Sequence, residues 1–176
     1  AAYLRKAIKR LTKDYTRPKD CEAMYNLGLI LKSEGKSEAA FDTLYRAVWD
    51  YTYNSAANYQ LAQLYMAGGD YPMALERLND AIRHNGDNLD AINLKSSILR
   101  LQNRKEDAKV CIENVLSFDP LNAYAACEKH LLTGDTCFTT LMRDDVESYL
   151  ELAIKYLHNG LEGQAVELLK YIDSKQ

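Results

Sequence analysis

The fold of this chain is decided by residues 21–88, which read CEAMYNLGLILKSEGKSEAAFDTLYRAVWDYTYN over 21–54 and SAANYQLAQLYMAGGDYPMALERLNDAIRHNGDN over 55–88. The two segments align without a gap at a spacing of 34 residues. Alanine recurs at Ala40 and Ala74, and leucine follows four residues later in each segment. A fixed period of this length predicts a fold built from repeated pairs of helices.

The same register continues on both sides of this segment. Residues 89–122 form a third unit, in which Ala108 takes the place of the two earlier alanines. An irregular helical insertion is expected over 123–145, followed by a last repeat over 146–176. Residues 1–14 are expected to be the end helix of a truncated repeat.

Small residues at fixed places have a physical reason in helix packing. Gly28 on a first helix is expected to let it approach Ala40 on the second, while Leu27 and Leu44 fill the space around that contact. A single helix pair leaves one apolar face uncovered, so the array is stable only when neighbouring pairs cover each other.

These units resemble the tetratricopeptide repeat family. Small residues stand at the eighth, twentieth and twenty-seventh places, and Pro120 stands at the thirty-second place of the third unit. The resemblance covers 21–122 most closely. It implies an all-α fold, a right-handed α-solenoid of antiparallel helix pairs that forms one domain over 1–176.

Polar residues mark the expected helix starts. Ser37 and Asp70 stand where an N-cap is required, and Asn54 or Ser55 is expected to cap the first helix of the second unit. Asp144 is expected to cap the last helix pair.

In resembling proteins, places two, five, nine, twelve and thirteen of each first helix line a concave groove. The resemblance therefore implies a partner-binding groove whose places five, nine and twelve hold Tyr25, Leu29, Lys32, Tyr59, Gln63, Met66, Asn93, Ser97 and Arg100. An exposed patch of Tyr25, Leu29, Tyr59 and Met66 would suit a peptide, a neighbouring domain or a second subunit. The alternative is that these are ordinary, scattered surface apolar residues.

The sequence shows no catalytic motif such as HExxH, G-x-S-x-G or a glycine-rich phosphate loop. The acidic pairs Asp144–Asp145 and Glu106–Asp107 fall at expected helix starts, where negative charge complements the helix dipole, so capping is preferred to acid–base chemistry. The cysteines have neither CxxC nor zinc-type spacing. We therefore expect no enzyme activity, no cofactor and no metal.

Composition limits the partner classes. The chain is 47% hydrophobic and 27% charged, with a net charge of −3 and no basic cluster, which argues against nucleic acid. No apolar stretch predicts a membrane span. We expect a cytoplasmic fragment of a longer protein that binds a protein, a peptide or the missing part of its own chain, or that forms a homodimer.

A narrower resemblance suggests an alternative function. The segments 45–51 (YRAVWDY), 90–95 (DAINLK), 119–122 (DPLN) and 149–153 (YLELA) are similar to the C-terminal repeat region of large bacterial proteins. The N-terminal domain of those proteins is uncharacterised and resembles sugar-processing folds. This resemblance implies an accessory domain of a larger carbohydrate-active bacterial enzyme.

Overall fold

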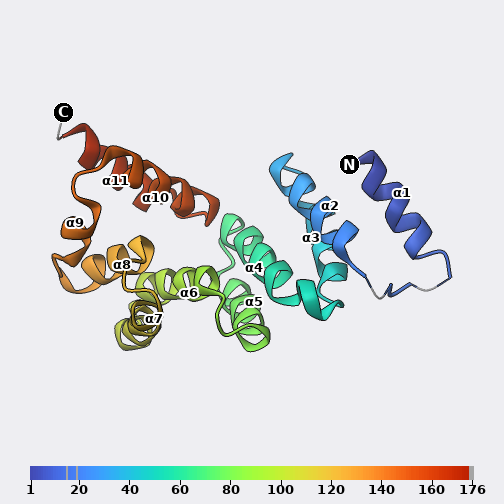
Figure 1. Ribbon diagram of the computed structural model, residues 1–176, viewed down its shortest axis with the longest axis horizontal. Helices are drawn as coiled ribbons and strands as arrows, with labels where there is room; N and C mark the ends of the chain where they lie inside the picture. The colour runs from blue at the N-terminus through green and yellow to red at the C-terminus, as the bar shows by residue number, and fades with distance from the viewer. Residues whose placement is uncertain (15, 19, 175–176) are drawn as a thin grey trace. The chain divides into compact units, whose positions relative to one another are not determined.

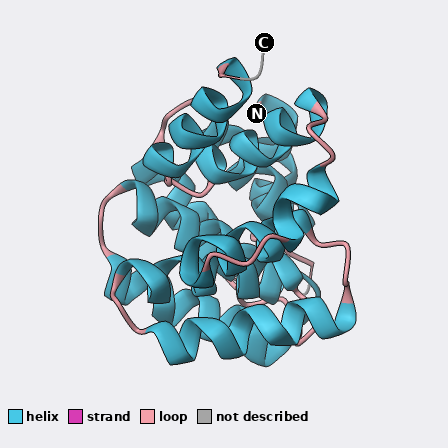
Figure 2. Cartoon of the chain, turned by 90° about the vertical axis from the view of Figure 1, so that its left-hand side faces the viewer, coloured by secondary structure: helices cyan, strands magenta, loops and turns pink. Residues whose placement is uncertain are grey.

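The computed structural model describes residues 1–14, 16–18 and 20–174. Within these ranges the chain consists of helices and connecting loops without strands (Figure 2), which confirms the predicted all-α class. The chain divides into two compact units, Ala1–Asn88 and Leu89–Gln176.

The first unit contains two helix pairs preceded by one more helix. Its helices are α1 (Ala2–Leu11), α2 (Glu22–Ser33), α3 (Ser37–Ala47), α4 (Tyr51–Ala67) and α5 (Tyr71–His84). Within this unit, α2 packs against α3, and α4 packs against α5 (Figure 1). The first helices of the two pairs, α2 and α4, also contact each other.

The second unit is less regular. Its helices are α6 (Leu89–Leu101), α7 (Lys105–Phe118), α8 (Ala123–Thr133), α9 (Cys137–Met142), α10 (Val146–His158) and α11 (Glu162–Asp173). The pairs α6–α7 and α10–α11 are regular, whereas α8 is followed by the short helix α9 (Figure 1). Gly134 ends α8 in the left-handed conformation, with φ of 75°.

The regular helix pairs share one kind of turn. Each turn contains a residue with positive φ: Gly35 (71°), Gly69 (76°), Asn103 (58°) and Gly160 (70°). The next N–H donates to the carbonyl five residues earlier at 2.9 Å, in the bonds Lys36–Leu31, Asp70–Tyr65, Arg104–Leu99 and Leu161–Tyr156. This is the Schellman geometry, and asparagine can replace glycine in it because asparagine tolerates the left-handed region.

The residues of the 34-residue period lie in the core. Ala40, Ala74 and Ala108 are fully buried, as predicted. Gly28 is also buried, but its close neighbour is Leu44, since a Cβ on Gly28 would lie 2.6 Å from two Leu44 side-chain atoms. The small residue therefore makes room for the leucine of the paired helix.

Two predicted caps are wrong at the start of α4. The helix begins at Tyr51, and Asp50 caps it by accepting from the Thr52 N–H at 3.0 Å. Asn54 and Ser55 are buried within the helix instead, where Asn54 donates to the Val48 carbonyl at 2.8 Å. The reason is that Asp50 also accepts from the Cys21 N–H at 2.9 Å, which joins the starts of α2 and α4.

Other helix ends also differ in part from the predictions. Asp70 caps α5 as expected, accepting from the Met73 N–H at 3.1 Å. Ser37 is instead the first residue of α3. The cap of α10 is Asp145, which accepts from the Ser148 N–H at 2.9 Å, whereas Asp144 has a left-handed φ of 53°. That conformation turns the chain before the helix.

The last helix departs from the period by one residue. The place held by Leu44 and Leu78 in the first two repeats is held by Leu169 in the last repeat, but Leu169 is 39% exposed and Leu168 is buried in its stead. Ala165, Leu168 and Ile172 are spaced by three and four residues, so they lie on one helix face.

Candidate functional site

The predicted groove residues are less exposed than expected. Met66, Asn93 and Ser97 have exposed fractions of only 4%, 3% and 0%, so the prediction of an exposed Met66 is wrong. Methionine is apolar and flexible, which suits it to filling gaps in a core. Ser97 faces the next first helix, α8, where its hydroxyl lies 2.9 Å from that of Tyr124.

Gln63 is also buried, with an exposed fraction of 6%, whereas the remaining predicted residues of the first unit are partly accessible. Tyr25, Leu29 and Lys32 on α2 and Tyr59 on α4 are half-buried. Tyr25 stacks on Tyr53 with ring centroids 5.4 Å apart and also packs against the hydrophobic core. Tyr25 and Tyr59 each combine an aromatic face with a polar tip, which is typical of interface residues.

Lys32 organises the polar part of this face. Its Nζ donates to Gln60 Oε1 at 2.8 Å and to Gln63 Oε1, and both glutamines lie on α4. The Gln63 Nε2 donates in turn to the Tyr59 hydroxyl at 3.0 Å. The structure thus joins three of the predicted groove residues, Lys32, Tyr59 and Gln63, in one network and adds Gln60 to it.

The charge of Lys32 is held by neutral groups. Of the ion pairs between described residues, none includes Lys32. Burial lowers the pKa of Lys32 to about 8, because removal from water disfavours the charged form. Lys32 is therefore a half-buried ammonium without a described carboxylate partner.

The second unit has a paired cation at the matching place. Arg100, also predicted for the groove, donates from Nε and Nη2 to the Glu128 carboxylate at 2.7 and 3.2 Å. Glu128 is fully buried and also accepts from the Tyr156 hydroxyl at 2.7 Å. Burial opposes the positive charge of Arg100, but the carboxylate outweighs this effect and raises the pKa of the guanidinium.

The groove prediction missed an apolar stripe on α10. Leu150, Ile154 and Leu157 are 43%, 50% and 45% exposed. They occupy places five, nine and twelve of the last repeat, counted from Val146. The spacing that selected residues in the first three units would also have found these three.

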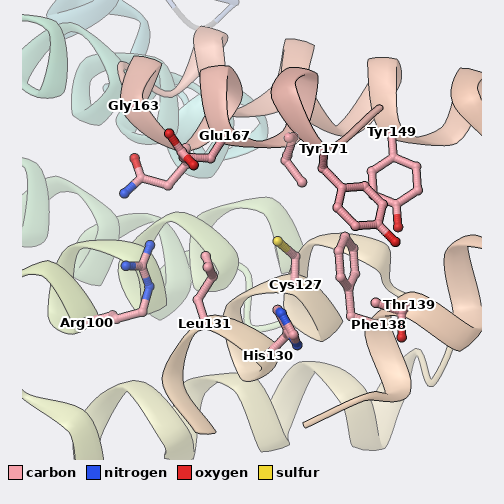
Figure 3. Close-up of a pocket in the computed structure, with 12 residues that line it drawn as sticks. Arg100, Cys127, His130, Leu131, Phe138, Thr139, Tyr149, Gly163, Glu167 and Tyr171 are labelled. Carbon is pink, nitrogen blue, oxygen red and sulfur yellow. The ribbon is translucent and has the colours of Figure 1, made fainter. Parts of the chain in front are cut away.

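The second unit also contains an apolar pocket of about 260 Å³ (Figure 3). It is lined by Arg100, Cys127, His130, Leu131, Phe138, Thr139, Tyr149, Gly163, Gln164, Glu167, Leu168 and Tyr171. Figure 3 shows Arg100 toward one end and Tyr149 and Tyr171 toward the other. Burial raises the pKa of the Cys127 thiol to about 12, so this cysteine is protonated and a poor nucleophile at neutral pH.

The described side chains form no arrangement suited to a metal. Across 1–14, 16–18 and 20–174, no group of three or more His, Cys, Asp or Glu residues is placed to hold an ion. His84 lies in the last turn of α5, and its Nδ1 is 2.9 Å from the Asp80 carbonyl oxygen. None of the helices described is both long and apolar enough to cross a bilayer.

Comparison with known proteins shows what the geometry resembles. Sequence profiles of the tetratricopeptide repeat match residues 22–48 and 59–109. A tetratricopeptide repeat protein from Parabacteroides merdae is similar in structure, with 18% identity, a TM-score of 0.72, and coverage of 98% of this chain and 71% of that one. At such low identity the likeness shows the fold alone.

Two further solved structures are similar to this chain. YrrB, described as a tetratricopeptide protein with an unusual peptide-binding site, is 16% identical, with a TM-score of 0.68 over 98% of this chain and 92% of its own. MamA is 16% identical, with a TM-score of 0.62 over 88% of this chain and 91% of its own. The chain therefore carries tetratricopeptide repeats and has the helical repeat fold of these proteins.

Proposed function

We propose that this chain is a protein-interaction scaffold that binds a polypeptide partner through one face of its first unit. This face, called here the α2–α4 surface, consists of Tyr25, Leu29, Lys32, Tyr59 and Gln60. It joins two tyrosines, an aliphatic side chain and a half-buried ammonium within one pair of contacting helices. The network that holds Lys32 between the helices is the observation that carries the proposal.

The composition of this surface favours a polypeptide. Protein interfaces concentrate their binding energy in a few side chains, among which tyrosine is enriched because it buries apolar area and also forms hydrogen bonds. Tyr25 and Tyr59 provide such rings, and Lys32 lies on the same pair of helices. Peptide binding is also described for the similar protein YrrB.

A pair of double variants tests the proposal. Tyr25→Ala/Tyr59→Ala removes both rings from the α2–α4 surface, and Tyr51→Ala/Tyr71→Ala removes two exposed tyrosines elsewhere in the same unit. Proteins retained from a lysate by the parent chain should be retained by the second variant and lost by the first. Retention of the same proteins by both variants would contradict the proposal.

The stability of these variants must be measured in parallel. Tyr25 packs against the core, so its removal will lower the melting temperature. Binding is therefore compared at a temperature where circular dichroism shows both variants to be fully folded.

The identity of the polypeptide is a separate question. A second copy of this chain and another part of its own polypeptide are two candidates for the α2–α4 surface. Sedimentation of the parent and of Tyr25→Ala/Tyr59→Ala would distinguish a homodimer. The sugar-processing alternative rests on sequence resemblance alone and gains no support from this geometry.

A further inference from the structure

The two units place a cation at equivalent positions. Lys32 and Arg100 both occupy place twelve of a first helix. Each donates to a side chain 28 residues later on the next first helix, Gln60 for Lys32 and Glu128 for Arg100. The pairs α2–α4 and α6–α8 are in contact within their own units. The geometry is repeated, but the chemistry of the acceptor is not.

In the second unit the counter-charge is internal. Glu128 receives two bonds from Arg100 and one from Tyr156, and it is fully buried. A carboxylate in this position neutralises the guanidinium and fills its own acceptor sites. The charge at place twelve is therefore already matched within the chain.

In the first unit the same position holds a neutral amide. Gln60 offers Lys32 a carbonyl oxygen but no negative charge. An ammonium has three N–H donors, and its described bonds to Gln60 and Gln63 use two of them. Burial of a cation without a counter-charge is unfavourable, so a carboxylate brought from outside would be stabilised here.

The charge of the two units agrees with this difference. Residues 1–88 contain 12 Lys and Arg against 11 Asp and Glu, whereas residues 89–176 contain 10 against 14. The exposed basic residues Arg5, Lys9 and Arg10 on α1 contribute to the positive balance of the first unit. An acidic ligand is therefore attracted to the first unit more than to the second.

We infer that the α2–α4 surface selects an acidic polypeptide segment, in which an Asp or Glu side chain supplies to Lys32 the charge that Glu128 supplies to Arg100. This inference rests on the proposed function, because it specifies the partner of the same surface. The tyrosines bind apolar parts of the segment, and the carboxylate sets its position.

The test is a selection from a random peptide library. Nine-residue peptides displayed as internal segments, without a free C-terminus, are selected on the full 176-residue chain. The parent chain should enrich peptides in which one position is restricted to Asp or Glu. Replacing that residue by Asn or Gln in a synthetic, C-terminally amidated peptide should weaken binding about tenfold or more.

Gln60→Glu is the decisive variant. It gives Lys32 the internal carboxylate of the second unit, so the acidic preference should disappear while the protein remains folded. Lys32→Met should abolish the preference as well. Gln102→Glu adds the same charge at an exposed residue of the second unit and should leave the preference unchanged.

The outcomes separate this inference from the proposed function. Enriched peptides that lack an acidic position, or that bind Gln60→Glu as tightly as the parent, would overturn the inference and leave peptide binding intact. Binding that requires a free C-terminal carboxylate would also overturn it. If no peptide is enriched, both the inference and the proposed function fail.

Discussion

The pairs Lys32–Gln60 and Arg100–Glu128 show that one repeat position can hold a cation in two electrostatic states. Both join neighbouring first helices through residues 28 apart. In the second unit the pair is complete and buried, so it belongs to the interior. In the first unit the amide leaves the cation unneutralised, and this is the position that we propose for recognition. A change of one functional group at place six therefore separates a repeat with an internal ion pair from a repeat whose cation has no described counter-charge.

The largest expected effect comes from making the second unit like the first. Glu128→Gln replaces the buried carboxylate by an amide, leaving the charge of Arg100 without its partner. We expect a loss of at least about 3 kcal/mol in the free energy of unfolding, measured by urea denaturation. Glu167→Gln is the control, since its pair with Lys170 is exposed and contributes little. A loss below about 1 kcal/mol would show that the buried Arg100–Glu128 pair does not contribute substantially to stability.

The next effect concerns pH and the first unit. Because folding lowers the pKa of Lys32 from 10.5 to about 8, the unfolded chain binds more protons between these values. The unfolding free energy should therefore rise with pH in this window. Below pH 8 the full cost of burying the charged Lys32 lowers the stability, and above pH 8 this cost is progressively removed. A pKa shift of this size corresponds to a change of at most about 3 kcal/mol in the free energy of unfolding.

Lys32→Met isolates this contribution. The variant lacks the titrating ammonium. As the pH rises from 7 to 10.5, the unfolding free energy of the parent should therefore increase relative to that of the variant. Urea denaturation at several pH values measures the difference, in which other titrating residues largely cancel. Parallel curves for the two proteins would show that Lys32 is not buried as described.

The smallest effects compare two glycines, one in each unit. Gly28→Ala should cost about 1–3 kcal/mol, because its Cβ would lie 2.6 Å from the buried Leu44 side chain. Gly163→Ala should instead stabilise by up to about 1 kcal/mol, because its Cβ meets no atom within 4 Å and alanine favours helix. Thermal denaturation distinguishes the two signs. Equal changes in the melting temperature for the two variants would show that close packing against Leu44 is not the reason for glycine at position 28.

Much of the fold could be predicted because packing repeats at a fixed interval. Ala40, Ala74 and Ala108 are buried as the period requires, and Asn103 adopts the turn conformation of the glycines at its place. The start of α4 could not be predicted in this way. Asp50 caps the helix while also binding the Cys21 N–H, a contact between residues 29 apart that local pattern does not show.

The candidate site was predictable only in part. Lys32, Tyr59 and Gln63 were selected by their places, and the structure joins them in one network. Met66 was selected by the same rule but is buried, because exposure depends on the surrounding side chains and not on the place alone. Leu150, Ile154 and Leu157 on α10 stand at the corresponding places of the last repeat and are exposed, although they were not predicted.

The amino-acid sequence by itself determined the helical repeats, since small and large apolar residues recurring every 34 positions can be buried together only in nested helix pairs. The tertiary structure decided which charges are matched. Lys32 and Arg100 stand at the same place, but their different states depend on Gln60 and Glu128, which lie on another helix. Electrostatic balance is a property of groups brought together in space, so it emerges only when the helices pack.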